Sequence, residues 1–153
     1  MRILFVCTGN TCRSPMAEAI FNSKCDISND VKALSRGLSI VPKTKASQHS
    51  TTLIMESLQV SIGDREAIQL DEDTLKEVDL VLTMTSYIRD VLKYNFKDIE
   101  SKIFTLNEYV GVEGDVLDPY GGNKAIYKDT YDSLLESINL LIKKIKEDKD
   151  IKG

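Results

Sequence analysis

The segment that most constrains this chain is Cys-Thr-Gly-Asn-Thr-Cys-Arg-Ser, residues 7–14. It directly follows four apolar residues, 3–6, which are typical of a strand buried in a parallel sheet. It leads into Ser14-Pro15, where serine suits a helix N-cap and proline suits the first helical position. The order strand, loop, helix places the loop beyond the carboxyl end of a strand, where open α/β sheets bind their ligands.

The residue types in this loop favour an anion as the ligand. The free N–H groups and the dipole of a helix N-terminus attract negative charge. Gly9 can take a positive φ angle and Asn10 tolerates one, so successive N–H groups can face the same anion. The planar fork of Arg13 can hold two phosphate oxygens. Such a setting favours the thiolate form of Cys7, which is a nucleophile, with Ser14 as a candidate donor to the sulfur.

Other interpretations of this loop fit the residues less well. A buried structural cysteine would explain a lone Cys7, but not Cys-x5-Arg-Ser between a strand and a helix. A nucleotide-binding loop of the Walker type needs a lysine, and residues 7–14 contain none. Cys7 and Cys12 are not spaced like zinc ligands, and the one histidine, His49, is interpreted as a surface helix residue, so no metal site is expected.

A thiolate that attacks phosphorus needs a proton donor for the leaving group, and a carboxyl is the remaining choice. Asp118 is the best candidate, because Pro119 restricts its backbone and Gly121-Gly122 allows sharp turns. From these residues alone, an ordinary turn is the better explanation of the Asp-Pro pair.

The rest of the chain alternates between expected strands and helices. Strands are expected at 31–34, 78–84 and 102–106, and helices at 14–24, 47–58 and 86–96. The apolar side of the helix at 47–58 is expected to consist of Leu53, Ile54, Met55 and Leu58. A long closing helix carries an apolar stripe at helical spacing: Tyr127, Tyr131, Leu134, Ile138, Leu141 and Ile145. This alternation predicts one α/β domain over residues 1–153 with a parallel sheet.

Composition excludes several classes of protein. The chain has 153 residues, of which 42% are hydrophobic and 29% charged, as in a globular domain. A net charge of −4 without a Lys/Arg stripe argues against a nucleic-acid partner. The N-terminal apolar run is too short for a signal peptide or a membrane span, which predicts a cytoplasmic protein without a membrane partner. Three cysteines, an odd number, predict thiols rather than a disulfide framework, and the expected state is a monomer.

Residues 7–15, with Ala17-Glu18 following, resemble the signature of low-molecular-weight protein tyrosine phosphatases. The later segment Asp118-Pro119-Tyr120-Gly121-Gly122 is similar to the second signature of that family, and residues 35–37 and 79–84 resemble its other recurrent segments. The resemblance extends over essentially the whole chain. It implies a Rossmann-like, three-layer fold, with a four-stranded parallel sheet flanked by helices.

The resemblance also implies a role for each residue of the motif. Cys7 would attack phosphorus and form a phosphocysteine, Arg13 would stabilise the transition state, and Asp118 would protonate the leaving group and then assist water. Asn10, Ser14 and Ser35 would hold the shape of the loop. Cys12 would be the family's second cysteine, able to form a reversible disulfide with Cys7 under oxidation. No metal or organic cofactor is implied; the partners are phosphorylated proteins as substrates and inorganic phosphate as product. The residues implied to bind the substrate are Thr8, Gly9, Asn10, Thr11, Cys12 and Ser14.

Thr11 bears on which phosphorylated residue is hydrolysed. Tyrosine-directed members usually carry Ile or Leu there, and they tend to have an aromatic residue in the loop that here spans 40–46 without one. Threonine in the loop, together with segments 104–110 and 115–119, resembles the protein-arginine phosphatase branch. Phosphoarginine presents a flat, polar guanidinium, which a hydroxyl accommodates better than a branched aliphatic group. Glu108, Glu113 and Asp115 are expected to add negative potential towards that cation, or else to form only a solvated loop.

The sequence therefore predicts a protein-arginine phosphatase, with a protein-tyrosine phosphatase as the alternative. Two other classes are weaker. A thioredoxin-linked arsenate reductase needs further cysteines near the third strand, whereas the remaining cysteine is Cys25, a packing thiol at the end of the first helix. A non-catalytic phosphate-binding module would lack one of Cys7, Arg13 and Asp118, and all three are present.

Overall fold

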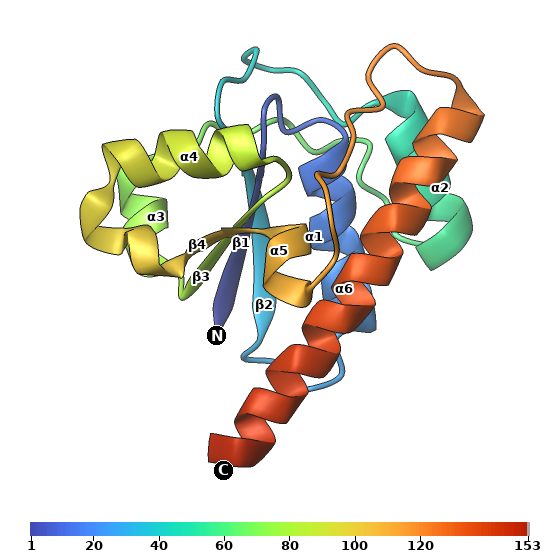
Figure 1. Cartoon of the computed structure of the whole chain (residues 1–153). Helices are drawn as coiled ribbons and strands as arrows, with labels where there is room; N and C mark the ends of the chain where they lie inside the picture. The colour runs from blue at the N-terminus through green and yellow to red at the C-terminus, as the bar shows by residue number, and fades with distance from the viewer. Residues whose placement is uncertain (153) are drawn as a thin grey trace.

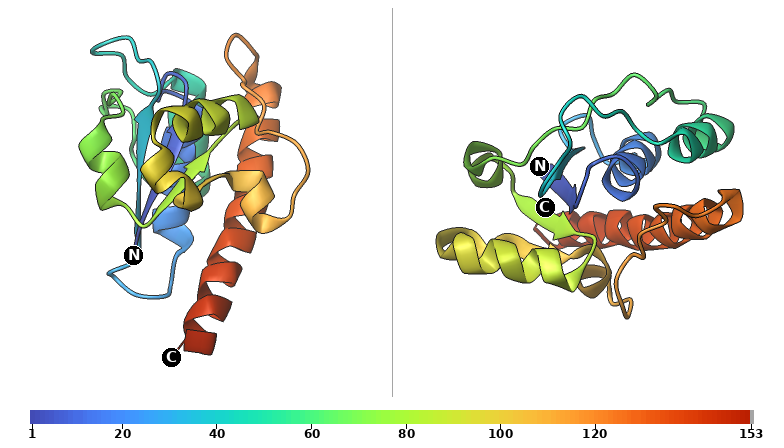
Figure 2. Two further views of the ribbon diagram at one scale, coloured as in Figure 1. Left: turned by 60° about the vertical axis from the view of Figure 1, so that its left-hand side comes forward. Right: turned by 90° about the horizontal axis from the view of Figure 1, so that it is seen from above.

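The computed structural model describes residues 1–152, which form a sheet with helices on both faces (Figures 1 and 2). The strands are β1 Arg2–Cys7, β2 Lys32–Gly37, β3 Leu80–Thr83 and β4 Ile103–Thr105. The helices are α1 Arg13–Lys24, α2 Gln48–Leu58, α3 Glu72–Glu77, α4 Ser86–Asn95, the 3₁₀ helix η1 Lys97–Lys102, α5 Leu106–Val110 and α6 Lys124–Lys152. The predicted single α/β domain with a four-stranded parallel sheet is confirmed.

Strand β1 lies in the middle of the sheet, whose order is β2-β1-β3-β4. It pairs in parallel with β2 on one side and with β3 on the other. The chain therefore leaves β1 towards one edge of the sheet and later returns to build the opposite edge. A crevice forms at the carboxyl end of the strands where the order reverses, and this is the usual ligand site of such sheets. Cys7, the last residue of β1, lies at that point.

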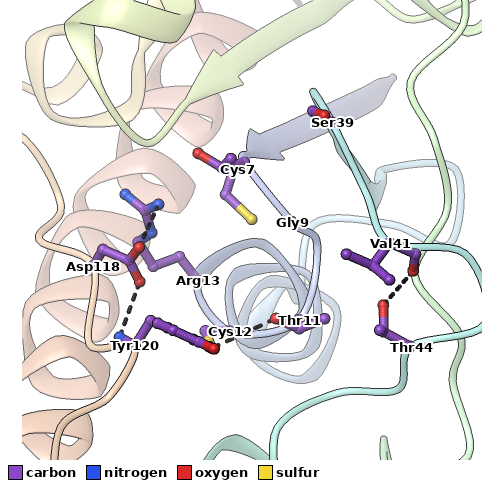
Figure 3. Close-up of a pocket in the computed structure, with 11 residues that line it drawn as sticks. Cys7, Gly9, Thr11, Cys12, Arg13, Ser39, Val41, Thr44, Asp118 and Tyr120 are labelled. Atoms are coloured by element: carbon purple, nitrogen blue, oxygen red, sulfur yellow. Dashed lines mark hydrogen bonds and ion pairs between the residues drawn. The ribbon is translucent and has the colours of Figure 1, made fainter.

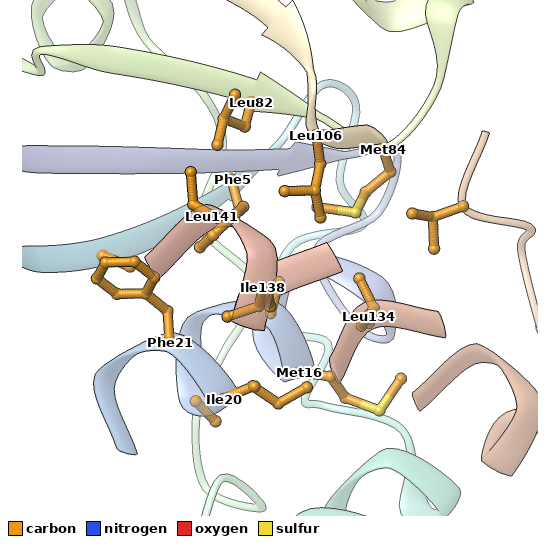
Figure 4. Packing of buried hydrophobic residues seen from close by; sticks show 14 of the residues in the cluster. Phe5, Met16, Ile20, Phe21, Leu82, Met84, Leu106, Leu134, Ile138 and Leu141 are labelled. Atoms are coloured by element: carbon orange, nitrogen blue, oxygen red, sulfur yellow. The ribbon is translucent and has the colours of Figure 1, made fainter. Parts of the chain in front are cut away.

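The two faces of β1 divide the hydrophobic core into two clusters. Ile3 and Phe5 face a cluster that also contains buried residues of α1, α2 and α6. Leu4 and Val6 face a smaller cluster formed with residues of α3 and α4, among them Leu75. Every β1 residue from 3 to 7 is buried, as the unbroken apolar run predicted. Figure 4 shows the larger cluster, in which Phe5, Phe21 and Ile138 fill the space between sheet and helices.

Helix α6 lies on the same side of the sheet as α1 and packs against it (Figure 1). The predicted apolar stripe is confirmed, since all six of its side chains are buried: Tyr127, Tyr131, Leu134, Ile138, Leu141 and Ile145. The helix thus buries one side along five turns and leaves the other side polar. Among the described residues, no helix is both long enough and apolar enough to cross a membrane.

Several predicted boundaries were wrong. Ser14 is not an N-cap, because α1 begins at Arg13 with Cys12 at the cap position. Residues 35–37 belong to β2 rather than following it. Met55 does not join the apolar side of α2, because 46% of its surface is exposed while Leu53 and Ile54 are buried.

Three short helices, α3, α5 and η1, were missed because none is long enough to show an apolar stripe, and side-chain caps stabilise two of them. The side chain of Asp71 caps α3 by accepting from the N–H of Thr74 at 2.8 Å. Thr105 and Glu108 form a reciprocal capping box at the start of α5. The spacing Thr-x-x-Glu was a readable signal for that helix, whereas η1 has no side-chain cap.

Two neighbouring leucines of α6 test the placement of its buried stripe. Leu141 is fully buried, whereas Leu140 is 37% exposed. We expect Leu141→Ala to lower the free energy of unfolding by about 2–5 kcal/mol, because it leaves a cavity in the larger core cluster. Leu140→Ala should cost less than about 1 kcal/mol. Urea unfolding followed by circular dichroism measures both, and equal losses would contradict this orientation of α6.

Candidate active site

The loop between β1 and α1 turns at Asn10, not at Gly9. Asn10 has φ 58°, in the left-handed region, whereas Gly9 does not have a positive φ. The expectation for Gly9 was therefore wrong and that for Asn10 is confirmed. A β-carbon on Gly9 would meet only Thr11 Oγ1, at 3.9 Å, so the space there is open. Asparagine fits position 10 because it tolerates a positive φ angle and because its side-chain amide forms hydrogen bonds through both its nitrogen and its oxygen.

The Asn10 side chain is completely buried and uses each of its hydrogen-bonding groups. Its Nδ2 donates to Ser14 Oγ at 2.8 Å and to Ser35 Oγ at 3.1 Å. Its Oδ1 accepts from the Ile68 N–H at 2.9 Å and from the Arg65 guanidinium at 3.0 Å. These contacts join the loop to α1, to β2 and to the segment before α3. The predicted supporting positions of Ser14 and Ser35 agree with this geometry.

Asn10 also bears on the hydrogen bond between Ser14 and Cys7. Ser14 Oγ lies 2.8 Å from Cys7 Sγ, and either atom could donate on distance alone. Because the Asn10 amide nitrogen can only donate, Ser14 Oγ accepts from it, which leaves the Ser14 proton available for a bond to the sulfur. The backbone N–H of Asn10 also points at Cys7 Sγ, at 3.3 Å. The Ser14 hydroxyl and the Asn10 N–H can therefore both donate to the sulfur, which is the arrangement that a negatively charged acceptor needs.

Arg65 and Glu18 form an ion pair behind the loop. Arg65 Nε lies 3.7 Å from Glu18 Oε2, and both side chains are largely buried. Arg65 also donates to Ser35 Oγ at 2.7 Å, and the Ser35 hydroxyl donates to Glu18 Oε1 at 3.2 Å. The sequence analysis missed Arg65. It lies 55 residues beyond Asn10, in a polar stretch without periodicity, and no local signal indicates the contact.

Arg13 connects the loop to the segment that carries Asp118. Its NH1 donates to the Val116 carbonyl at 3.0 Å, and its NH2 lies 3.7 Å from Asp118 Oδ2. The Arg13 side chain is 5% exposed, whereas that of Asp118 is 54% exposed. Asp118 Oδ1 accepts from the Tyr120 N–H at 3.0 Å. The carboxyl is therefore oriented by the arginine and a backbone amide, while still accessible to solvent.

The turn after Asp118 depends on both glycines, as predicted. Gly121 has φ 79°, which favours glycine. At Gly122, a β-carbon would lie 2.9 Å from the Pro119 carbonyl oxygen and 2.8 Å from the Ile126 side chain. With this backbone conformation the chain reverses its direction and enters α6 at Lys124.

Cys7, Arg13 and Asp118 line one cavity of about 350 Å³ (Figure 3). Of the other predicted loop residues, Thr8, Gly9, Thr11 and Cys12 also line it, whereas Asn10 and Ser14 lie behind it. The opposite wall was not predicted from the sequence. It consists of Ser39, Val41 and Thr44, whereas Tyr120 lines the cavity on the side of Asp118 (Figure 3).

Hydrogen bonds on two sides hold that opposite wall. The N–H groups of Leu38 and Ser39 donate to the carbonyls of Cys7 and Thr8, at 2.9 and 3.0 Å. On the other side, Gln69 accepts from the Ile40 N–H at 3.1 Å and donates to the Leu38 carbonyl at 2.8 Å. The wall is thus fastened to the floor of the cavity.

Of the two alternatives for Glu108, Glu113 and Asp115, the geometry favours a solvated loop apart from the cavity. None of the three lines it, and all three line a separate hollow. Burial alone would raise the pKa of Glu108. However, hydrogen bonds from the Thr105 N–H and the Arg89 guanidinium outweigh burial and hold that pKa below its usual value.

The remaining candidate residues lie where the sequence predicted. His49 is exposed on α2, with its ring centroid 4.8 Å from that of Tyr127. Cys25 is half-buried at the end of α1, and Cys7, Cys12 and Cys25 are all free thiols. Within the described part of the chain, no group of three or more His, Cys, Asp or Glu side chains is placed to hold a metal ion.

A thiol at the carboxyl end of the central strand, inside a loop that faces a helix N-terminus and a buried arginine, defines a phosphate-handling α/β enzyme. Comparison with known proteins gives the family. Residues 2–151 match the family model of "Low molecular weight phosphotyrosine protein phosphatase". The chain belongs to this family and is a protein phosphatase.

Individual relatives cover nearly the whole chain. A protein-arginine-phosphatase of Bacillus subtilis is 42% identical over 97% of this chain and 99% of its own length. The low molecular weight protein-tyrosine-phosphatase PtpB of Staphylococcus aureus is 36% identical over 90% of this chain and 94% of its own. A solved structure of the arginine phosphatase YwlE, a cysteine-to-serine mutant with a phosphorylated active-site serine, has a TM-score of 0.90 and 41% identity. It covers 98% of this chain and 99% of its own.

The ion pair behind the loop can be tested against a surface pair. We expect Arg65→Ala to lower the free energy of unfolding by about 1–3 kcal/mol, because it leaves the buried Glu18 carboxylate without its cation. Arg2→Ala is the matched control, since Arg2 and Glu77 form an exposed pair at 3.6 Å whose loss should cost less than about 1 kcal/mol. Urea denaturation gives both values, and a smaller loss for Arg65→Ala would contradict its supporting position.

Proposed function

We propose that this protein is a protein-arginine phosphatase that hydrolyses phosphoarginine in proteins through a phosphocysteine intermediate. The position of Thr11 carries the proposal. It lines the cavity together with Cys7, and it offers a hydroxyl where a branched aliphatic residue would crowd and desolvate a guanidinium. Asp118 lines the same cavity and can pair with that cation as well as transfer a proton. The identity with the arginine phosphatase of B. subtilis supports this assignment.

In the first step, the Cys7 thiolate attacks phosphorus from the floor of the cavity. The S–P bond forms while the P–N bond to the arginine breaks, and Asp118 gives its proton to the leaving nitrogen. Ser14 Oγ and the Asn10 N–H, which lie 2.8 and 3.3 Å from Cys7 Sγ, can both donate hydrogen bonds to the sulfur in this step. Arg13 and the loop N–H groups bind the phosphoryl oxygens as their charge is redistributed.

In the second step, water hydrolyses the phosphocysteine. The Asp118 carboxylate takes a proton from the water, whose oxygen forms a bond to phosphorus as the S–P bond breaks. The products are inorganic phosphate and the Cys7 thiolate, so the enzyme returns to its starting state. The 54% exposure of the Asp118 side chain gives water access to this carboxylate.

Protein-tyrosine phosphatase activity is the second candidate. Two exposed apolar side chains favour it: Val41 is 67% exposed and Tyr120 is 81% exposed, and both line the cavity. They can flank an aromatic ring that enters between them. The identity with PtpB of S. aureus supports this candidate.

The proposal includes the setting of the enzyme. Its partners are phosphorylated proteins, with phosphate as the product, and it acts in the cytoplasm as a monomer without metal or organic cofactor. Because Cys7 and Cys12 line the same cavity, a reversible disulfide between them under oxidation would protect the nucleophile and switch the enzyme off.

Substitution of the nucleophile and of the acid tests the mechanism. Cys7→Ser should abolish turnover of a phosphoarginine peptide while inorganic phosphate still binds, because the anion-binding groups remain. Asp118→Asn should lower kcat by about 10²–10⁴-fold, because no proton reaches the leaving nitrogen. The matched control is Cys25→Ser, which removes the half-buried thiol at the end of α1 and should keep full activity. Substantial turnover by Cys7→Ser would refute a thiolate mechanism.

Thr11→Ile tests the basis of specificity. We expect kcat/KM for a phosphoarginine peptide to fall and kcat/KM for the matching phosphotyrosine peptide to rise, because the new side chain replaces a hydroxyl by apolar surface. The loss on phosphoarginine should be about 10-fold, as for an unpaired polar group of roughly 1–2 kcal/mol. Steady-state kinetics on both peptides measures the ratio. If that ratio does not change, Thr11 does not select the substrate.

A further inference from the structure

A second hollow adjoins the active-site cavity. Thr11, Thr44 and Tyr120 line both, so they form the ridge between the two. The second hollow has a volume of about 520 Å³ and is more open to solvent. We call it the side hollow. Its other lining residues are Lys45, Ser47, His49, Gly121, Gly122 and Tyr127.

Backbone hydrogen bonds hold the side hollow in shape. The Ser47 N–H donates to the Thr11 carbonyl at 2.9 Å, and the Ala67 N–H donates to the Thr44 carbonyl at 2.7 Å. These bonds fasten the segment that carries Lys45 to the phosphate loop on one side and to the strand-like segment 65–67 on the other. A ligand therefore meets a formed surface and does not have to order it, which lowers the cost of binding.

The charge of the side hollow differs from that of the protein. The chain has a net charge of −4, yet the one fully charged group that lines the side hollow is the Lys45 ammonium, and none of its lining residues carries a carboxylate. Lys45 Nζ lies 3.9 Å from Asp64 Oδ1, and both side chains are well exposed, at 54% and 103%. Because an exposed pair at this distance is weak, the ammonium can turn from Asp64 to a ligand.

We propose that the side hollow is a subsite for an acidic side chain of the substrate protein, close in sequence to the phosphorylated residue. The inference rests on the proposed function only in requiring a phosphoprotein substrate. When the phosphorylated side chain enters the cavity, the polypeptide must pass its mouth, where Thr44 and Tyr120 form the ridge to the side hollow. An extended chain advances about 3.3–3.6 Å per residue, so the first three residues on one side lie within reach.

A peptide scan tests this subsite. Peptides with one phosphoarginine carry Glu, Gln or Lys at each of the three positions on either side, and kcat/KM is measured at low salt. At one or more of these positions, Glu should raise kcat/KM over Gln by about two- to fivefold through KM, as one exposed ion pair allows. The difference should shrink in about 0.5 M NaCl, where the screening length is a few ångströms.

Two charge-reversal variants on the same loop identify the side chain that causes the preference for Glu. Lys45→Glu should invert the preference, so that Lys at those positions becomes better than Glu. Lys43→Glu changes the net charge equally, but Lys43 does not line the side hollow, so the positional preference should persist. The Ki of inorganic phosphate should be unchanged in both variants, which shows that the phosphate loop is intact.

Two results would overturn the proposal: equal kcat/KM for Glu and Gln at all six positions of the wild type, or a Lys45→Glu profile that matches the Lys43→Glu profile. The same scan on phosphotyrosine peptides separates this proposal from the choice of substrate. If only phosphotyrosine peptides are hydrolysed, the arginine assignment fails, and the positional preference for Glu still decides whether the subsite exists.

Discussion

The buried side chain of Asn10 is the contact on which the site depends. Its backbone reverses the loop, and its amide fixes Ser14, Ser35 and the segment before α3 at once. Because the amide nitrogen can only donate, it leaves the Ser14 proton available for a bond to Cys7. One side chain therefore determines both the shape of the anion-binding loop and the polarity around the sulfur. Arg65 and Glu18 hold this arrangement from behind.

The sheet could be predicted because each strand carries its own signal. An unbroken apolar run such as 3–6 is buried on both faces only in a parallel sheet covered by helices, and α6 shows its buried stripe directly. The ends of the helices and strands were harder to predict. Ser14 has the residue type of a cap, but its hydroxyl is used by the sulfur and by Asn10, so tertiary contacts overrode the local preference. Helices α3 and η1 lack the length for a periodic pattern.

The residues of the candidate site also divide into those that a local sequence pattern predicts and those that it does not. Cys7, Arg13 and Asp118 were found because their motifs are local and the first two share one loop. Arg65, Gln69 and Ser39 were missed because their contacts join segments about 30–60 residues apart, which no local pattern shows. The acids at 108, 113 and 115 mislead for the opposite reason. They are close to Asp118 in sequence, but Glu108 is bound by Arg89 and faces a different hollow.

The two exposed side chains at the cavity mouth can be substituted during evolution more freely than the rest of the site. Val41 and Tyr120 contribute little to either core cluster, so replacing them should cost the fold almost nothing. Cys7, Asn10 and Ser14, by contrast, are buried and bonded to one another, so they tolerate little change. Substitutions at the entrance can therefore change which substrate proteins are bound while the reaction chemistry is conserved. Such a fold can diverge in substrate specificity without diverging in catalysis.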